Sequence, residues 1–333
     1  MTVTPRIGVV GAGSLGFHHI RILRDLPGLR FAGFVETSRD RAAKVEQELG
    51  VKAHASLPEL LAVADAVIIV VPTPAHFAVA SEAIDQGKHV FIEKPMTTTI
   101  EEADSLLALA TKRGVIVQIG HIERFNRAVR AALPFVKLPR FIDSERLAPF
   151  SPRGSDVAVV LDLMIHDIDL LLTLVGSAAK DIAAVGVPVL TPMLDIANAR
   201  VTFTSGAVAN ITSSRISRER KRKIRIFQQS GYLSLDLAAG TGEFFRLKSD
   251  IDPLMVRTAP VDIAAFVDRI PLEAPEGEPL RLELESFVAA VTGEGPVVVT
   301  GEEGRLALGV ALRIVKEIER TLPSLKGATP PHA

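Results

Sequence analysis

Short apolar stretches alternate with amphipathic segments along the first 120 residues. The apolar stretches are rich in Val, Ile and Phe, which is typical of strands, and the segments between them repeat apolar residues with a helical period. Such an alternation predicts a doubly wound parallel sheet with helices on both faces. The expected strands are 6–10, 30–36, 66–71, 88–92 and 115–119.

Local residues support the boundaries of these elements. Ser56 with Glu59, and Thr99 with Glu102, have the spacing of a capping box at the start of a helix. Gly114 stands where a helix is expected to end, because glycine readily adopts the left-handed conformation of a C-cap.

The pattern changes after about residue 121. Strand-like stretches then follow one another without helices between them, which predicts a largely antiparallel sheet with helices on one face and solvent or a partner subunit on the other. We therefore expect an α/β chain with a doubly wound domain at 1–121 and a second α+β domain with a large open sheet at 122–333. Its expected elements are a helix at 123–136, a strand at 140–148, a helix at 156–175, strands from 181 to about 248, and helices at 280–292 and 302–321.

A glycine turn follows the first expected strand. Gly11 permits a tight turn, Gly13 lets a pyrophosphate approach the backbone, and Gly16 lets the next helix pack closely on the strand. The helix N-terminus, which includes Ser14 and Leu15, supplies amide donors for phosphate oxygens. In its context of strand, turn, helix and second strand, this turn predicts a Rossmann-type dinucleotide site.

Glu36 ends the second expected strand, about twenty residues after Gly16. Its carboxylate can accept hydrogen bonds from both adenosine ribose hydroxyls and would repel a 2′-phosphate, which favours NAD over NADP as the cofactor. NADP is the alternative cofactor, because Arg39 and Arg41 lie just beyond this strand, where an arginine can hold the 2′-phosphate. The two arginines can equally begin the next helix as solvated charges.

The composition excludes several chemistries. None of the 333 residues is cysteine, so disulfides, thiolate catalysis and cysteine-ligated metals are excluded. The single tyrosine, Tyr232, has Asp236 four positions later, so no Tyr-x-x-x-Lys pair exists. Proton transfer must therefore use histidine, lysine or a carboxylate.

The formal net charge of −1 provides no overall basic field for nucleic acid or an anionic membrane. The chain has no run of eighteen apolar residues and no signal-peptide pattern at its start, so we expect a cytoplasmic protein that binds small molecules and copies of itself. One basic run, 215–225, is expected to be a solvated hairpin; contact with a diphosphate or with a neighbouring subunit is the alternative.

Polar residues follow two of the expected strands at the edge where doubly wound sheets bind ligands. Glu93 and Lys94 precede a proline after the strand at 88–92, where they form either a catalytic pair or a strand-end salt bridge. Pro72, Thr73 and His76 follow the strand at 66–71, and His76 is either part of the cofactor site or a histidine at a helix start.

A second cluster lies in the expected helix at 156–175. Spacings of four and seven place Asp162, His166 and Asp169 on one helical face. The cluster could be a metal site or a buried polar network, but no further histidine lies nearby, and we expect no metal. A general base held by neighbouring carboxylates is the favoured interpretation.

The glycine turn, the 72–76 stretch, Glu93-Lys94-Pro95 and the Asp162-x-x-x-His166 helix, in this order, resemble the Gfo/Idh/MocA oxidoreductase family over essentially the whole chain. The resemblance implies hydride exchange between a nicotinamide and a carbon of a sugar, cyclitol or related polyol. It also implies a homodimer or homotetramer assembled through the open C-terminal sheet.

The same resemblance implies roles for three residues. Lys94 matches a lysine that touches the substrate hydroxyl and the nicotinamide ribose, His166 matches the acid/base histidine, and Asp162 matches the carboxylate before it. Met164 departs from the family pattern, which commonly has a small residue there, and this narrows the pocket.

Two further stretches, 120–126 and 149–154, resemble the branch of the family that oxidises nucleotide sugars. Arg124, Asn126 and Arg153 are donors that a sugar diphosphate would need, or else solvated charges and loop residues. The resemblance of these two stretches implies oxidation of a secondary alcohol, the 3-hydroxyl of a UDP-N-acetylhexosamine. A free sugar or inositol is the alternative substrate, and a non-catalytic NAD-binding regulator is the alternative of another class.

Overall fold

The computed structural model describes residues 4–152, 154–248 and 266–322. Contacts between Cα atoms divide the chain into two compact units: unit 1 is Met1–Phe125 with Gly277–Gly309, and unit 2 is Asn126–Glu276 with Val310–Ala333. Residues 277–309 thus return to the first unit instead of continuing the second, which differs from the expected division at residue 121.

Unit 1 is built on a five-stranded sheet in the order β2-β1-β3-β4-β5. All neighbouring strands pair in parallel, so the expected doubly wound sheet is confirmed. The strands are β1 (Arg6–Val10), β2 (Arg30–Val35), β3 (Ala66–Ile69), β4 (His89–Glu93) and β5 (Val117–Gly120).

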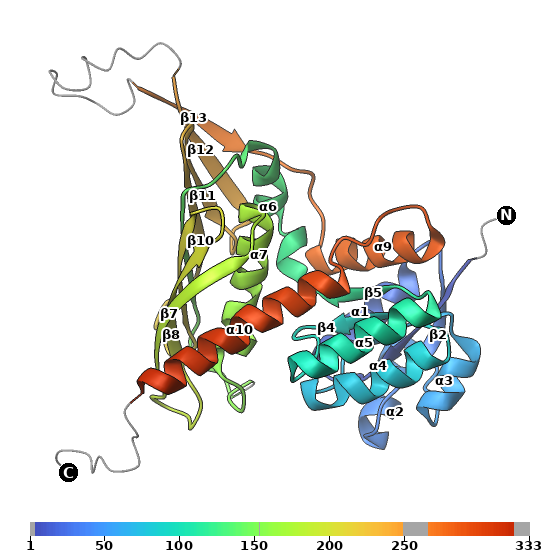
Figure 1. Ribbon diagram of the computed structural model, residues 1–333. Helices are drawn as coiled ribbons and strands as arrows, with labels where there is room; N and C mark the ends of the chain where they lie inside the picture. The colour runs from blue at the N-terminus through green and yellow to red at the C-terminus, as the bar shows by residue number, and fades with distance from the viewer. Residues whose placement is uncertain (1–3, 153, 249–265, 323–333) are drawn as a thin grey trace, which may run out of the picture. The chain divides into compact units, whose positions relative to one another are not determined.

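Helices cover both faces of this sheet (Figure 1). On one face, Ile20 of α1 and Phe287 of α9 belong to the same buried cluster as Phe91 of β4, and the two phenylalanine rings lie 5.7 Å apart. On the other face, α4 and α5 lie side by side. The helices of unit 1 are α1 (Ser14–Asp25), α2 (Arg39–Leu49), α3 (Leu57–Val63), α4 (His76–Asp85), α5 (Ile100–Arg113), α9 (Pro279–Thr292) and the first part of α10 (Gly301–Thr321).

The local signals at the ends of α5 are confirmed. The Thr99 side chain accepts from the Glu102 amide, and the Glu102 side chain accepts from the Thr99 amide, which forms the capping box. Gly114 ends the helix with φ of 66° in the left-handed region.

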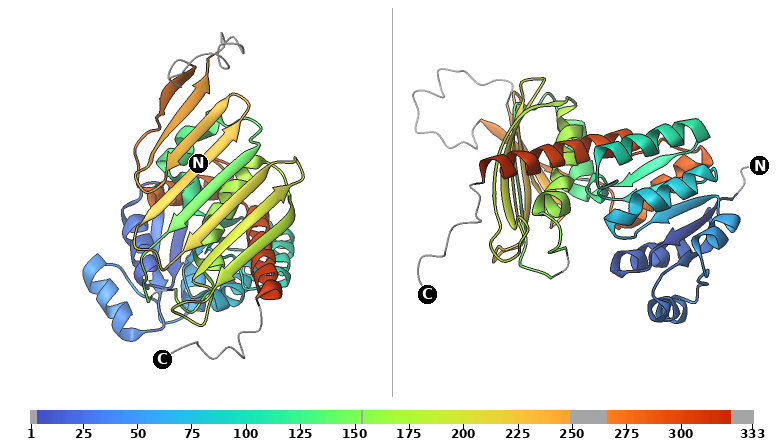
Figure 2. Two further views of the ribbon diagram at one scale, coloured as in Figure 1. Left: turned by 90° about the vertical axis from the view of Figure 1, so that its left-hand side faces the viewer. Right: turned by 60° about the horizontal axis from the view of Figure 1, so that its bottom comes forward.

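Unit 2 contains an eight-stranded sheet in the order β13-β12-β11-β10-β6-β9-β8-β7 (Figure 2). The β6–β9 pair is parallel and the other pairs are antiparallel, as expected of a mostly antiparallel sheet. The strands are β6 (Phe141–Leu147), β7 (Ala179–Val187), β8 (Ile196–Phe203), β9 (Val208–Ser214), β10 (Lys221–Gln228), β11 (Gly231–Asp236), β12 (Thr241–Leu247) and β13 (Val267–Leu272).

Burial alternates along these strands, which defines an inner and an outer face. On the inner face, Ile142, Ile211 and Ile226 are buried where α6 (Arg127–Ala132) and α7 (Ile165–Val175) cover the sheet. No helix of the described chain covers the outer face (Figure 2, left).

Two helices of unit 2 differ from their expected extents. The expected helix at 123–136 is interrupted, because the Asn126 side chain accepts the Ala128 amide and caps a new helix that begins at Arg127. Pro134 lies in a 3₁₀ turn after this helix. The expected helix at 156–175 begins with a single π turn at Val160–Met164 and only then becomes the regular helix α7. Single π turns occur frequently at functional sites.

Within the described ranges, no helix is both long enough and apolar enough to span a lipid bilayer.

Candidate active site

The glycine turn has the geometry that a dinucleotide requires. Gly11 has φ of +96°, and a Cβ there would lie 2.6 Å from the Val70 carbonyl oxygen. A Cβ at Gly16 would lie 2.1 Å from the Gly11 carbonyl oxygen, so the strand and α1 approach closely only without side chains. A Cβ at Gly13 would meet no atom within 4 Å. The open side at Gly13, at the N-terminus of α1, fits a pyrophosphate.

Glu36 lies immediately beyond β2 and contacts the same turn. Its two carboxylate oxygens accept from the Ala12 and Ser38 amides at 2.9 and 3.0 Å, and the Arg41 guanidinium lies 3.5 Å away. Burial raises the pKa of Glu36, but these amide hydrogen bonds and the Arg41 charge outweigh it and hold the pKa below its ordinary value. Glu36 is therefore an ionised acceptor fixed against the turn.

The segment after β3 places Pro72 and Thr73 at the carboxyl edge of the sheet, where a 3₁₀ turn at Thr73–Ala75 leads into α4. His76, by contrast, is buried, and its two ring nitrogens lie 2.9 Å from the carbonyl oxygens of Pro95 and Val71. A neutral imidazole has one N–H, so it donates to only one of these two carbonyl oxygens. His76 therefore lies between the segment after β3 and the segment after β4.

Glu93 and Lys94 end β4 at the same edge, and the Lys94–Pro95 peptide is cis. The Glu93 carboxylate is buried and lies 2.9 Å from Nε2 of His19, a fully buried residue of α1. The sequence pattern did not identify His19. The available signal was a histidine on the apolar face of the helix that follows the glycine turn.

Unit 2 carries the second group of candidate side chains. Asp162 lies in the π turn and His166 in the first turn of α7, and both are half-buried. Asp169 is buried in the interior. Asp169 is thus less accessible than the other two members of the expected cluster. Asp162 and His166 remain the accessible pair of this helix.

Buried arginines fix the backbone around this pair. The Arg146 guanidinium forms two hydrogen bonds of 2.9 Å with the Asp167 carboxylate, next to His166 in the chain. Arg215 donates to the carbonyl oxygens of Gly154, Val157 and Leu194, the first two in short hydrogen bonds, so this residue of the basic run is structural.

The loop at Gly154 adjoins Asp162. A Cβ at Gly154, where φ is +75°, would lie 2.8 Å from Oδ2 of Asp162. The carboxylate of Asp162 therefore packs against a position that only glycine accommodates without displacement.

The donors expected for a diphosphate have mostly structural partners. Arg124 pairs with Glu303 at 3.1 Å. Asn126 accepts from the Ala128 amide and donates to the Leu237 carbonyl oxygen, which engages both ends of its amide group in capping and anchoring α6. Arg153 lies outside the described residues.

Two other observations concern sites of different kinds. The described residues contain no group of three or more histidine and carboxylate side chains that could hold a metal ion.

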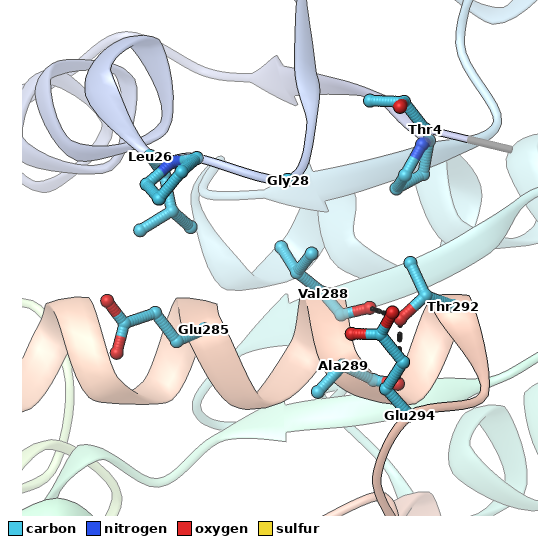
Figure 3. Close-up of a pocket in the computed structure, with 10 residues that line it drawn as sticks. Thr4, Leu26, Gly28, Glu285, Val288, Ala289, Thr292 and Glu294 are labelled. Carbon is cyan, nitrogen blue, oxygen red and sulfur yellow. Dashed lines mark hydrogen bonds between the residues drawn. The ribbon is translucent and has the colours of Figure 1, made fainter. Parts of the chain in front are cut away.

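A pocket of about 280 Å³ in unit 1 lies between α9 and the loops that contain Thr4 and Gly28 (Figure 3). It is at the amino ends of β1 and β2, the opposite edge from Glu36 and Lys94, and contains none of the candidate residues.

A parallel sheet with this glycine turn, an ionised acid after β2 and a lysine after β4 defines a dinucleotide-binding oxidoreductase. Residues 5–121 match the oxidoreductase family GFO/IDH/MocA with an NAD-binding Rossmann fold, and residues 127–234 match the GFO/IDH/MocA C-terminal domain. The chain belongs to the Gfo/Idh/MocA family of NAD-binding oxidoreductases.

Several relatives are similar over much of the chain. The UDP-N-acetylglucosamine 3-dehydrogenase of Acidithiobacillus ferrooxidans is 39% identical over 95% of this chain and 98% of that protein. A solved structure of that enzyme superposes with a TM-score of 0.86 at 37% identity, covering 96% of this chain and 99% of that one. The NAD-dependent scyllo-inositol 2-dehydrogenase of Bacillus subtilis is 29% identical over 64% of this chain and 68% of that protein.

Proposed function

We propose that this chain oxidises the 3-hydroxyl of UDP-N-acetylglucosamine with NAD as the hydride acceptor. The observation that carries the proposal is the 39% identity to a UDP-N-acetylglucosamine 3-dehydrogenase across nearly the full length of both chains. The inositol dehydrogenase matches a smaller part of the chain at lower identity. The nucleotide sugar is therefore the preferred substrate class.

The proposed mechanism assigns roles to three side chains, those of Lys94, His166 and Asp162. NAD, when bound, would supply the acceptor for the hydride that leaves C3 of the sugar. His166 removes the proton of the 3-hydroxyl as general base, and Asp162 orients its imidazole. The Lys94 ammonium stabilises the negative charge that develops on the substrate oxygen. The 3-hydroxyl becomes a ketone, and its proton stays on His166.

The proposed cofactor residues surround the glycine turn and the carboxyl edge of the sheet of unit 1. Glu36 is the group that selects NAD over NADP, because its ionised carboxylate accepts from ribose hydroxyls and repels a 2′-phosphate. The backbone of the turn holds the pyrophosphate, and the segment after β3 contacts the nicotinamide half. The full set is Gly11, Gly13, Ser14, Leu15, Gly16, Glu36, Pro72, Thr73, Glu93 and Lys94.

The assay for this function follows the absorbance of reduced nicotinamide while UDP-N-acetylglucosamine, UDP-glucose, scyllo-inositol or glucose is presented with NAD or NADP. We expect turnover with UDP-N-acetylglucosamine and NAD. Turnover with the inositol alone would contradict the proposal and make the chain a polyol dehydrogenase. No change in absorbance with any substrate, together with tight NAD binding, would make it a non-catalytic NAD-binding regulator.

We further propose that two or four copies assemble through the outer face of the sheet of unit 2. Phe141, Phe227, Tyr232 and Phe245 stack in a row across β6, β10, β11 and β12, with ring centroids 5.7, 5.4 and 4.6 Å apart. No helix of the described chain covers this row, and a second copy would bury it by twofold symmetry.

Light scattering coupled to gel filtration tests the assembly. Tyr232→Glu places a charge in the aromatic row and is expected to yield monomers. Val63→Glu, at an exposed apolar position of α3, is the matched control and should leave the oligomer intact. Wild-type monomers, or an unchanged Tyr232→Glu oligomer, would exclude this interface.

A further inference from the structure

The residues on both sides of Lys94 are held by buried histidines. Glu93 precedes Lys94, and its carboxylate lies in a space that exists because β5 has Gly120 opposite, where a Cβ would lie 2.9 Å from Oε2 of Glu93. That same oxygen accepts the Lys94 amide at 3.3 Å. The carboxylate therefore supports the backbone of Lys94 directly, and whatever fixes Glu93 fixes the start of the lysine side chain.

His19 fixes Glu93 from α1. Its Nε2 lies 2.9 Å from Oε1 of Glu93, and among the described residues its Nδ1 has no hydrogen-bond partner. A carboxylate oxygen accepts hydrogen bonds, so it is the Nε2-protonated form of the ring that donates to Glu93. The side chain is fully buried and its ring packs edge-on against Phe91 at 5.8 Å, which allows it little freedom. The helix that follows the cofactor turn is thereby coupled to the end of β4.

His76 acts on the other neighbour of Lys94. Its Nδ1 lies 2.9 Å from the Pro95 carbonyl oxygen and its Nε2 lies 2.9 Å from the Val71 carbonyl oxygen. Because the residue is buried, water does not compete for these carbonyls. The neutral ring donates its one N–H to a single carbonyl oxygen, and in the Nδ1-protonated form that oxygen belongs to Pro95.

We propose that His19 and His76 are positioning residues for Lys94, His19 acting through the Glu93 carboxylate and His76 through the Pro95 carbonyl. The proposal rests on the proposed role of Lys94 in the oxidation. Neither histidine touches the substrate. Their effect is to hold the backbone from which the Lys94 side chain extends at one place on the carboxyl edge.

The test compares His19→Leu, which removes the donor but keeps an apolar side chain, with His19→Gln, which retains an N–H that can reach Glu93. His54→Leu is the matched control, because it removes a histidine contact to a carbonyl, that of Ala32, elsewhere in unit 1. Two quantities are measured: kcat per NADH-binding site, and hydrogen exchange of the Lys94 amide by mass spectrometry of peptides spanning 92–97.

We expect His19→Leu to lower kcat per site by about tenfold or more and to speed exchange of the Lys94 amide by about tenfold. His19→Gln should stay within about threefold of the wild type in both measurements, as should His54→Leu. Counting sites by NADH binding separates a lower rate from a smaller folded fraction.

Two results would overturn the proposal: wild-type kcat per site in His19→Leu, or His19→Gln as impaired as His19→Leu. If His19→Leu binds no NADH, His76→Leu provides the same test through Pro95, and normal kcat there would equally overturn it. If the wild type oxidises none of the alcohols, the proposed function has failed; the exchange measurement still decides whether these histidines hold the lysine backbone.

Discussion

Arg146 of β6 and Asp167 of α7 form a two-pronged ion pair in the interior of unit 2, with both nitrogen–oxygen distances at 2.9 Å. Their side chains are 4% and 2% exposed, so water does not solvate either charge. Removing one partner leaves the other charge buried, which costs about 3–5 kcal/mol. The pair fixes α7 on the sheet directly beside His166.

Arg146→Met is therefore expected to lower the free energy of unfolding of unit 2 by about 3–5 kcal/mol, measured by urea denaturation followed by circular dichroism. The double variant Arg146→Met/Asp167→Leu should recover much of that loss, because no charge remains buried. A single variant as stable as the wild type would show that the charges are solvated in solution.

The proposed acid/base chemistry predicts large losses of turnover. His166→Ala and Lys94→Ala are each expected to lower kcat by at least about tenfold to a hundredfold on UDP-N-acetylglucosamine. Lys88→Ala is the matched control, since Lys88 lies just before the amino end of β4 and donates to the Ala64 carbonyl oxygen. Near-wild-type rates in either active-site variant, with NADH binding intact, would refute the assigned roles.

Cofactor choice is expected to depend on Glu36. Glu36→Ser removes the charge that opposes a 2′-phosphate and leaves Arg41 able to pair with it, so the ratio of kcat/KM for NADP to that for NAD should rise at least about tenfold. Asp40→Ser, at an acid in the first turn of α2, should leave the ratio unchanged. An unaltered ratio in Glu36→Ser would remove the basis for NAD preference.

Substitutions at two glycines of unit 2 distinguish the effect of backbone strain from the effect of displacing the Asp162 carboxylate. Gly154 and Gly176 both have positive φ, but a Cβ would contact the Asp162 carboxylate only at Gly154 and meets no atom within 4 Å at Gly176. Gly154→Ala is expected to lower kcat/KM by about tenfold, whereas Gly176→Ala should cost about 1 kcal/mol of stability without loss of activity. Equal kinetics in the two variants would show that Asp162 tolerates displacement.

Stability is expected to fall as the pH is lowered from 7.5 to 5.5. Burial lowers the pKa of His89, against the opposing charge of Asp65, and its Nδ1 accepts the Ile116 amide at 3.0 Å. A histidine whose folded pKa lies below its ordinary 6.5 binds fewer protons folded than unfolded, so its stabilisation is complete above pH 6.5 and is lost below it. Burial lowers the pKa of His76 in the same direction, despite its two carbonyl contacts.

His89→Asn supplies an oxygen acceptor at the position of Nδ1 that does not titrate in this range. Its melting temperature should therefore fall less than that of the wild type between pH 7.5 and 5.5, by differential scanning calorimetry. Identical slopes in the two proteins would assign the pH dependence to other groups.

The first unit was largely predictable because its signals are local. The glycine turn, the acid after the second strand and the capping box at Thr99 each depend on a few consecutive residues, and the structure contains all three. What could not be predicted depends on distant partners. The apolar spacing of 280–292 predicts a helix with one buried face but not the sheet that it covers, and the His19–Glu93 contact joins residues 74 positions apart.

Residue type alone also could not show whether a polar side chain binds a ligand or stabilises the fold. Arg124, Asn126 and Arg215 suit a diphosphate by chemistry, yet each is occupied by a carboxylate, an amide or a carbonyl of the fold. Likewise, a helical period predicts a regular helix through Asp162, because nothing in the sequence spacing distinguishes a π turn from an α turn.

The return of α9 to unit 1 affects the order in which the protein can fold during its synthesis. Phe287 packs on Phe91, yet it is made after every strand of unit 2, the last of which ends at Leu272. A ribosome-bound chain that has only just completed β5 lacks the helix that covers this part of its sheet. Unit 1, although most of it is translated first, can therefore complete its hydrophobic core only after the strands of unit 2 have been synthesised.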